Sequence, residues 1–388
     1  MKISLLTGSV DPHYQLDLLS GLISTGIQVD FIGADSMKNA EIVRNRNVNF
    51  YNLRGNQDPN APINIKITRV LKYYYELIIY ALKTDSKLFH IQWENKFIYF
   101  DRTFLNIYYK ILRKRLVFTV HNVNAGERDE NDSFLNRLTL KFKYTIADHI
   151  IVHTQKMKRQ LMGDFNIDDD SVTMIPMGIN NVIPQTGLTR LQSKNKLRLN
   201  GDEKVLLFFG NIAPYKGLKY LILALVDLRK KFKDLRLIIA GRINSHEAYW
   251  QEIQKIIQEH DLKDYIIEKT GFIPDEDVEI YYKAADVSIL PYTYVFQSAV
   301  LFVSYSFGLP VIATDVGSLR EDIVEGKTGF LCQPKNPEDI AEKLDLYFQS
   351  DLFKNLEETR KIIKDYAQER YSWDKIGEKT CSVYQSLL

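Results

Sequence analysis

Short apolar runs alternate with amphipathic stretches along most of this chain, and this alternation restricts the fold more than any other feature of the sequence. The apolar runs of the first half have the length of buried strands and are Ile3–Leu6, Val29–Ile32, Phe89–Trp93, Leu116–Val120 and His149–His153. Stretches with helical periodicity separate several of them, at Gln15–Ser24, Ile65–Leu82 and Phe134–Ala147. Strands that alternate with helices in this way indicate βαβ units and a parallel sheet.

A second series of the same kind follows a polar stretch, 183–204, which has no strand pattern and is predicted to join two domains. Its predicted strands are Val205–Phe209, Leu237–Ala240, Tyr265–Ile267, Val287–Leu290 and Pro310–Thr314. Its predicted helices are Leu218–Phe232, His246–His260, Asp275–Ala285 and Ser298–Phe307, and the tail adds Pro337–Gln349, Leu352–Tyr366 and Ser372–Leu388. We expect two parallel-sheet α/β domains, 1–185 and 186–366, and a last segment, 367–388. Ligands of such sheets bind outside the carboxyl ends of the strands, which predicts a site in a cleft between the domains.

Composition narrows the class of protein. The 388 residues are 45% hydrophobic, enough for two cores, and the net charge of +2 gives no reason to expect nucleic-acid binding. The two cysteines, Cys332 and Cys381, have no zinc-site spacing, so we expect a reducing compartment and no metal. The N-terminus lacks the pattern of a signal peptide, and no apolar run approaches the roughly 20 residues of a membrane span. The sequence predicts a cytoplasmic protein, free or attached peripherally at the inner face of a membrane.

The segment Phe209–Gly217, FGNIAPYKG, combines a strand end, a glycine turn and the start of a helix. Gly210 permits a tight turn, and Pro214 suits the first helical position, where its missing N–H costs little. Lys216 then lies at the beginning of the helix, where a cation and free N–H groups together can bind a diphosphate. The alternative is an exposed lysine that points into water.

The segment 284–300, AADVSILPYTYVFQSAV, predicts a second helix start at the same edge of the sheet. Ser298 is a good N-cap, and the amides that follow it, beginning with Ala299, would face a phosphate or sugar hydroxyls. Tyr292 and Gln297 lie at the two ends of the loop and are further candidates for binding a donor. For Tyr292, simple packing is an equal alternative.

In the first half, polar residues follow two predicted strands. His121 comes directly after Leu116–Val120 and is a candidate catalytic residue, although a single histidine is more often structural. Asn122 and Arg128 follow in the same turn, and Asp11 and His13 follow the first strand. These four are candidates for binding an acceptor.

At this point the sequence resembles family 4 of the glycosyltransferases, which have the GT-B architecture. The resemblance covers nearly the full length and rests on four ordered blocks, FGNIAPYKG, YYKAADVSILP, FGLPVIATDVG with EGKTGFL, and YSWDKIGEKTCSVYQSLL. It implies two Rossmann-like doubly wound parallel-sheet domains that face a central cleft, with the closing helix crossing back to the first domain. It also implies a retaining transfer from a nucleotide-diphosphate sugar, without a metal or other cofactor. Lys216 matches the family's diphosphate-binding lysine, and His121 matches the histidine near the donor sugar.

The sequence departs from the family pattern at two places. Asn211 replaces the phosphate-binding arginine, and Val295 and Val303 replace a pair of glutamates that contact the sugar and the ribose. Some members carry a Gln-Ser pair here, as in FQSAV, so the change does not by itself imply inactivity. We expect Gly210 and Asn211 to remain at the donor, with Tyr292, Gln297 and Ser298 in place of the glutamates.

The acceptor is predicted from charge and from the resemblance, as a glycan or lipid-linked molecule in cell-surface polysaccharide biosynthesis. Between Ile65 and Arg115, Lys and Arg outnumber Asp and Glu by eleven to four and are interleaved with tyrosines. This composition suits an anionic membrane surface, and an ordinary solvated face is the equal alternative.

Two other functions fit parts of the pattern. One is an enzyme of the UDP-sugar epimerase type, which would alter the donor without forming an acceptor product. The other is a non-catalytic partner in a polysaccharide assembly complex, which the missing glutamates suggest.

Overall fold

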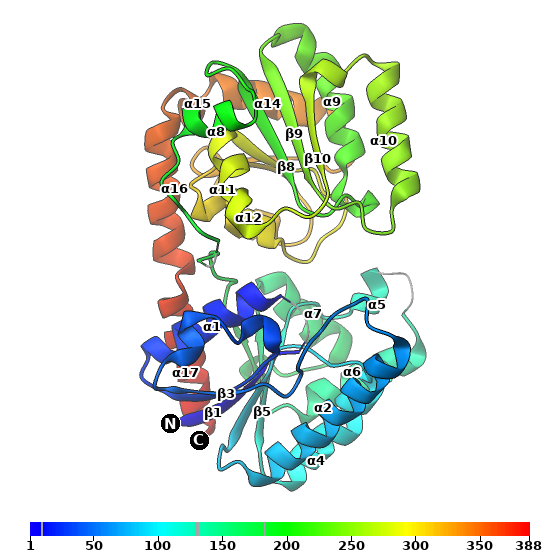
Figure 1. Cartoon of the computed structure of the whole chain (residues 1–388), viewed down its shortest axis with the longest axis vertical. Helices are drawn as coiled ribbons and strands as arrows, with labels where there is room; N and C mark the ends of the chain where they lie inside the picture. Colours follow the sequence, from blue (N-terminus) through cyan, green and yellow to red (C-terminus); the bar gives the residue numbers. More distant parts are fainter. Residues whose placement is uncertain (9–10, 129–131, 182) are drawn as a thin grey trace. The chain divides into compact units, whose positions relative to one another are not determined.

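The protein is described by a computed structural model that covers residues 1–8, 11–128, 132–181 and 183–388. These residues form two compact units (Figure 1). Unit 1 comprises Met1–Gly178 and Tyr371–Leu388, and unit 2 comprises Ile179–Arg370. Each is built on one parallel sheet with helices, so the predicted class of two Rossmann-like domains is confirmed.

The sheet of unit 1 has seven strands among the described residues, in the order β3-β2-β1-β4-β5-β6-β7. All of their pairings are parallel. The order reverses at β1 and β4, which is where open sheets of this kind bind ligands. The strands are β1 (Lys2–Leu6), β2 (Gln28–Ile32), β3 (Val48–Tyr51), β4 (Leu88–Ile91), β5 (Arg115–Val120), β6 (His149–Val152) and β7 (Val172–Met174).

The helices of unit 1 lie between these strands, except for the last one, which comes from the end of the chain. They are α1 (Pro12–Ser24), α2 (Ile63–Lys83), α3 (Ile98–Phe100), α4 (Asn106–Ile111), α5 (Ala125–Arg128), α6 (Phe134–Ile146), α7 (Gln155–Phe165) and α17 (Trp373–Leu387). A π-helical turn, Asp101–Leu105, joins α3 to α4.

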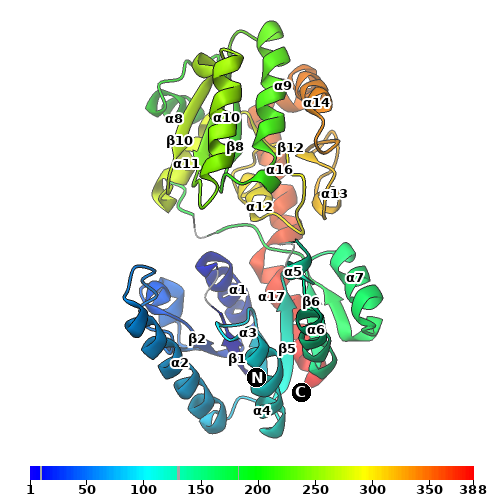
Figure 2. The same ribbon diagram turned by 90° about the vertical axis from the view of Figure 1, so that its right-hand side faces the viewer.

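Helix α17 belongs to unit 1 because it packs closely against α1, and Figures 1 and 2 show the two side by side. A Cβ added to Gly377 would lie 1.8 Å from the carbonyl oxygen of Gly21, so only glycine permits this approach. The ring of Trp373 fills the space beside Gly178. The unit boundaries therefore fall at 178 and 371, where these contacts begin, and not at the predicted 185 and 367.

Unit 2 has a six-stranded sheet in its described residues, in the order β10-β9-β8-β11-β12-β13. Its strands are β8 (Lys204–Phe209), β9 (Leu235–Gly241), β10 (Ile266–Thr270), β11 (Val287–Leu290), β12 (Val311–Thr314) and β13 (Gly329–Cys332). Its helices are α8 (Arg190–Lys196), α9 (Leu218–Lys231), α10 (Glu247–Glu259), α11 (Asp275–Ala284), α12 (Ala299–Ser306), α13 (Leu319–Asp322), α14 (Pro337–Gln349), α15 (Asp351–Lys354) and α16 (Leu356–Tyr371).

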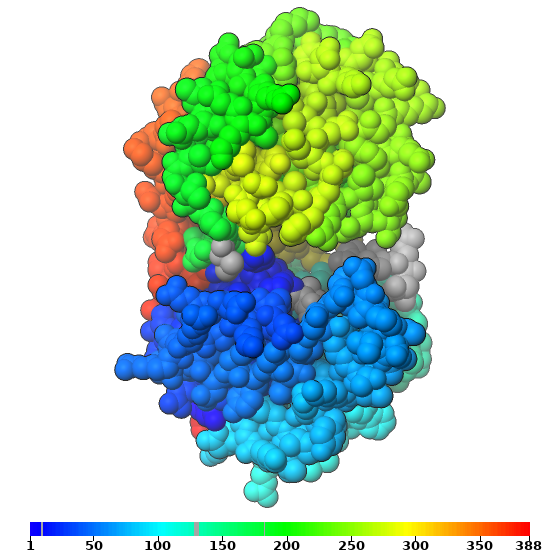
Figure 3. Space-filling model, viewed as in Figure 1, coloured from blue at the N-terminus to red at the C-terminus, as the bar shows by residue number. Residues whose placement is uncertain are grey.

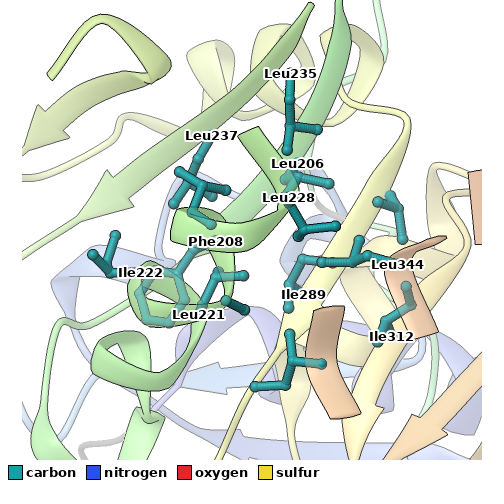
Figure 4. Packing of buried hydrophobic residues seen from close by; sticks show 14 of the residues in the cluster. Leu206, Phe208, Leu221, Ile222, Leu228, Leu235, Leu237, Ile289, Ile312 and Leu344 are labelled. Atoms are coloured by element: carbon teal, nitrogen blue, oxygen red, sulfur yellow. The ribbon is translucent and has the colours of Figure 1, made fainter. Parts of the chain in front are cut away.

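The largest apolar cluster of unit 2 holds α9 and α14 against its sheet (Figure 4). Leu206 and Leu237 from the strands and Leu221 and Leu344 from the helices are fully buried. Burial of each such side chain contributes about 1.5–3 kcal/mol, so this cluster fixes the strand ends that carry the loops described below.

Part of the stretch predicted to be an irregular junction is helical. Helix α8 starts with a capping box in which Thr189 and Gln192 satisfy each other's backbone N–H groups. Arg190 pairs with the buried Asp286, and the fully buried Lys194 donates to backbone carbonyls. The helix is too short and too polar to show an apolar period, and it is held by these polar contacts.

In the described part of the chain, no helix is long and apolar enough to cross a membrane.

Candidate functional site

The loop after β8 is shaped by glycines at positions that exclude a side chain. Gly210 has φ +103° and follows the strand directly. Pro214–Lys216 then form a 3₁₀ turn, and Gly217, with φ +68°, is the N-cap of α9. A Cβ on Gly217 would lie 1.8 Å from the carbonyl oxygen of Pro291, the residue after β11. The loop is thereby pressed against the segment that leads to α12.

This close approach brings Lys216 onto Tyr292. The Lys216 Nζ donates to the Tyr292 hydroxyl at 2.7 Å and lies 4.1 Å from the centre of its ring. The Tyr292 hydroxyl lies 3.1 Å from the Ser298 Oγ, and Tyr292 is fully buried. Three residues predicted for donor binding thus form one hydrogen-bonded chain. The ammonium is partly buried on an aromatic face, unlike an exposed lysine in water.

The start of α12 has backbone N–H groups that its N-cap residue leaves available. The Ser298 side chain makes no capping bond, because its hydroxyl pairs with Tyr292. Ala299, the first residue of the helix, is exposed. An anion at this end of the helix would be favoured by the free N–H groups and by the helix dipole.

Gln297 is the clearest unsatisfied group in this region. Both its Nε2 and its Oε1 are buried without a hydrogen-bond partner. Buried amides are nearly always paired, so this side chain is suited to donate to and accept from a bound molecule. Val295 and Val303, at the positions of the family's glutamates, offer no such groups.

Asn211 is exposed and accepts a hydrogen bond from the Asn244 amide at 3.3 Å. The backbone of Arg242, a cation not predicted from the sequence, pairs with Ile212, the residue after Asn211. Arg242 follows β9, its carbonyl accepts from the Ile212 N–H at 2.7 Å, and its guanidinium lies 4.3 Å from the ring centre of Phe272. The signal was present, since a glycine and an arginine directly follow a buried strand.

In unit 1, His121 lies at the carboxyl end of the sheet in a group of aromatic rings. It stacks on Trp93 with ring centres 4.0 Å apart and an interplanar angle of 3°, and Tyr14 packs edge-on against it. Its Nδ1 lies 3.1 Å from the Nε2 of His153. Trp93 and His153 end two of the predicted strands, so β4, β5 and β6 each deliver one ring to this place.

The hydrogen bonds fix the tautomer of His121. The His153 Nδ1 bonds to the Ile175 carbonyl and must be the donor, so its Nε2 accepts from the His121 Nδ1–H. The His121 Nε2 is then a bare acceptor, and it is buried without a partner. Burial, with His153 and Lys143 nearby, lowers the pKa of His121 well below its ordinary value. The ring stays neutral at pH 7 and can accept a hydrogen bond from a hydroxyl group.

The four residues predicted for acceptor binding lie at or next to the ends of helices and strands of unit 1. The Asp11 carboxylate caps α1 by accepting from the Tyr14 N–H at 3.1 Å, which is a structural role. His13 lies in the first turn of α1, and Asn122 follows β5 beside His121, where it is partly buried. Arg128 ends α5, and its side chain lies outside the described residues.

Lowering the pH from 7 to 5 is expected to reduce the free energy of unfolding by about 2–4 kcal/mol. Burial lowers the pKa of His153 to about 4 and that of His90 to about 3, so the folded protein stays unprotonated where unfolded histidines, with a pKa of 6.5, take up protons. Stability is therefore lost as the pH falls below about 6.5. Asp101 acts in the opposite direction, because burial raises its pKa to about 6.

Urea unfolding at the two pH values measures this difference. Equal stability at pH 7 and pH 5 would contradict the burial of neutral histidines in unit 1.

Two family models match the chain, one in each half. The model described as "Glycosyltransferase Family 4" matches residues 13–181, and the one described as "Glycosyl transferases group 1" matches residues 189–370. The second range contains the Lys216, Tyr292 and Ser298 chain, and the first contains His121.

Among curated proteins, an uncharacterised glycosyltransferase of Methanocaldococcus jannaschii is 27% identical over 61% of this chain and 59% of its own length. The D-inositol 3-phosphate glycosyltransferase of Corynebacterium glutamicum is 27% identical over 70% of this chain and 67% of its own. The chain thus spans about three fifths to two thirds of the length of these relatives.

Solved structures with the same fold include sucrose-phosphate synthase from Thermosynechococcus elongatus, with a TM-score of 0.76 and 19% identity over 100% of this chain and 99% of that one. Anabaena HepE in complex with UDP gives a TM-score of 0.76 and 17% identity over the whole of both chains. At 17–19% identity, these two matches show that the fold is shared and nothing beyond it.

Proposed function

Because the chain belongs to the glycosyltransferases that these two family models describe, we propose that it transfers a sugar from a nucleotide-diphosphate donor to a glycan or lipid-linked acceptor. The observation that carries the proposal is the position of the Lys216 ammonium. It is held on Tyr292 next to the uncapped start of α12, where a diphosphate would meet a cation and free N–H groups. HepE, a protein of the same fold, has been solved with UDP and with UDP-glucose.

In the proposed reaction, the bond between the sugar C1 and the diphosphate oxygen breaks, and the nucleoside diphosphate leaves with the bonding electrons. The acceptor hydroxyl oxygen forms the new bond to C1 on the same face, and its proton passes to the departing diphosphate oxygen. The transfer therefore retains configuration without a covalent intermediate. Lys216 and the start of α12 stabilise the charge that develops on the leaving group, a role worth about 3–4 kcal/mol for one well-placed donor.

We assign His121 to the donor sugar, because its Nε2 is a buried acceptor without a partner and its ring is held by Trp93 and His153. Burial lowers its pKa, and its Nε2 carries no proton in the tautomer that the hydrogen bonds fix, so the ring is assigned as a hydrogen-bond acceptor. Gln297 takes over hydroxyl recognition where the family's glutamates are absent. Arg242, whose backbone pairs with the residue after Asn211, supplies a cation in place of the family's arginine.

The pattern that suggested a membrane surface is only partly on the outside of unit 1. Tyr73, Tyr74, Tyr80 and Tyr109 are buried, so most of the tyrosines of this region belong to the core. The first half of α2, in contrast, exposes apolar side chains beside its basic ones, including Ile63 at 72% and Leu71 at 57%. Figure 3 shows the azure residues of this region on the surface of unit 1. This combination supports peripheral attachment to an anionic membrane at the cytoplasmic side.

Vesicles of phosphatidylcholine that contain phosphatidylglycerol are expected to bind the protein weakly, and added salt is expected to release it, because the attraction is largely electrostatic. Sedimentation with vesicles at low and high ionic strength measures this. Binding that salt does not weaken, or no binding at either ionic strength, would contradict the membrane assignment.

The function itself is tested by a screen of nucleotide-diphosphate sugars for an increase in melting temperature, followed by analysis of products. One donor is expected to stabilise the protein and to yield free nucleoside diphosphate together with a glycosylated acceptor. An altered donor sugar without an acceptor product would favour an epimerase-like enzyme. Failure of every donor to bind would favour a non-catalytic partner of an assembly complex, with the missing glutamates as the reason.

A further inference from the structure

Unit 1 contains a cavity whose lining is strongly basic. Its volume is about 540 Å³, within the range of ordinary ligand sites. Four cationic side chains line it, and no Asp or Glu does so: the cations are Arg54, Lys66, Arg69 and Lys96.

Arg54 is the residue that most needs a partner. It is 6% exposed, and its Nε is buried without a hydrogen-bond partner. Its guanidinium lies 4.4 Å from the ring centre of Tyr73 and bonds to the Tyr73 hydroxyl and the Asn95 amide oxygen, which are both neutral. No ion pair joins Arg54 to a carboxylate within the described residues. A buried guanidinium is normally neutralised, so an anion is the group that this position lacks.

Asp58 lies between the lining residues Gln57 and Pro59, but it is exposed and accepts from the Asn60 N–H, and the acidic residues on either side of Asn95 are paired elsewhere. Glu94 pairs with Arg102 and Lys143, and Asp101 accepts from the Tyr74 hydroxyl and from the Asn95 N–H. Lys66 and Arg69 lie in the first two turns of α2, whose start has no side-chain cap and carries the positive end of the helix dipole. The charged side chains that line the cavity are therefore all cationic, and the start of α2 adds to the positive potential.

The cavity is connected to His121 through one short loop. Trp93 stacks on His121, and Asn95 and Lys96, which follow it in the chain, line the cavity. Arg54 comes from the loop after β3, where its N–H bonds to the Gly33 carbonyl after β2. Both loops lie at the carboxyl edge of the sheet, which is the edge that presents His121.

We propose that this cavity binds a phosphate or diphosphate group of the acceptor, so that the enzyme glycosylates a phosphorylated substrate. The proposal rests on the proposed transferase function. A carboxylate would use one or two of the four cations, whereas a diphosphate engages all of them. Arg54 is only 6% exposed, so a lipid headgroup that stays in the plane of a bilayer does not satisfy the same requirement. The relative named as a D-inositol 3-phosphate glycosyltransferase has a phosphorylated compound in its name.

In the first experiment, inorganic pyrophosphate is added to the full chain, and hydrogen–deuterium exchange measures its binding. Binding is expected to protect peptides that cover residues 54–70 and 93–97. In the double variant Lys66→Ala/Arg69→Ala, which changes only partly exposed side chains, that protection is expected to need at least tenfold more pyrophosphate. Lys72→Ala is the matched control, because it removes one positive charge from the same helix without touching the cavity, and it is expected to behave as the parent. Equal loss in Lys72→Ala, or no protection of these peptides in the parent, would overturn the proposal.

The second experiment identifies the source of the phosphate. Exchange is compared for phosphatidylcholine vesicles that carry either a polyprenyl diphosphate or phosphatidylglycerol. Protection by the polyprenyl diphosphate or by free pyrophosphate, with loss in the double variant, supports an acceptor phosphate. Protection by phosphatidylglycerol alone overturns it in favour of a membrane contact. Both experiments measure binding to unit 1 and need no turnover. The phosphate site can therefore be disproved while the donor screen succeeds, and it can be confirmed while the donor screen fails.

Discussion

Lys216→Ala is expected to lower kcat/KM for the nucleotide sugar by about 10²–10³-fold, with little change in stability. The ammonium is placed where charge develops on the leaving diphosphate, and its loss removes an interaction that strengthens as the bond breaks. The effect should therefore fall mainly on kcat. Steady-state kinetics with the donor found in the screen, with the unfolding free energy measured in parallel, gives the result.

Two further variants make this prediction specific. Lys219→Ala removes a lysine in the first turn of α9 whose ammonium pairs with Glu252, and it should leave the rate unchanged. Tyr292→Phe keeps the ring beneath the ammonium but removes the hydroxyl to which Lys216 donates, so an intermediate loss of about fivefold to tenfold is expected. Activity of Lys216→Ala within a few-fold of the parent would remove Lys216 from the mechanism.

His121→Ala is expected to lower kcat by about 30–100-fold, equivalent to about 2–3 kcal/mol of transition-state stabilisation. It deletes the buried acceptor and also leaves the His153 Nε2 unpaired. His121→Gln offers an amide oxygen in nearly the same direction, so it should recover part of the rate.

A purely structural His121 would give a different outcome. Both variants would then lose stability to a similar degree, and kcat per folded molecule would stay within about threefold of the parent. The comparison of kcat with unfolding free energy for the two variants separates these cases.

The sequence predicted the central strands because their apolar runs are continuous and buried on both faces. It missed β3, β7 and β13, which have three or four residues each and lie at or near the edges of the sheets. Short edge strands carry polar or glycine positions, as in Val172–Met174 and Gly329–Cys332, so the period that marks a strand is absent.

The residues of the candidate site were predictable from the sequence, but their contacts with one another were not. Lys216, Tyr292 and Ser298 were each predicted from their place at a strand end or helix start. Their direct contact was not predictable, because it depends on Gly217 lying against the Pro291 carbonyl, a contact across two neighbouring strands. Arg54 gave no signal at all, since it follows a strand that the sequence did not reveal.

The role of His121 could be assigned only once its neighbours in the fold were known. In the sequence it stands alone after a strand, and a single histidine is ambiguous. In the fold, β4, β5 and β6 are adjacent and bring Trp93 and His153 to it. The sequence placed all three residues at or next to strand ends, but only the strand order shows that these ends are neighbours.

In the proposed mechanism, the start of α9 and the start of α12 bind one diphosphate together through Lys216. A crystal structure of the full chain with the nucleotide sugar found in the screen is the decisive measurement. We expect a diphosphate oxygen about 3 Å from the Lys216 Nζ and another within hydrogen-bonding distance of the Ala299 N–H. A diphosphate held elsewhere in unit 2, with Lys216 still bonded only to Tyr292, would contradict it.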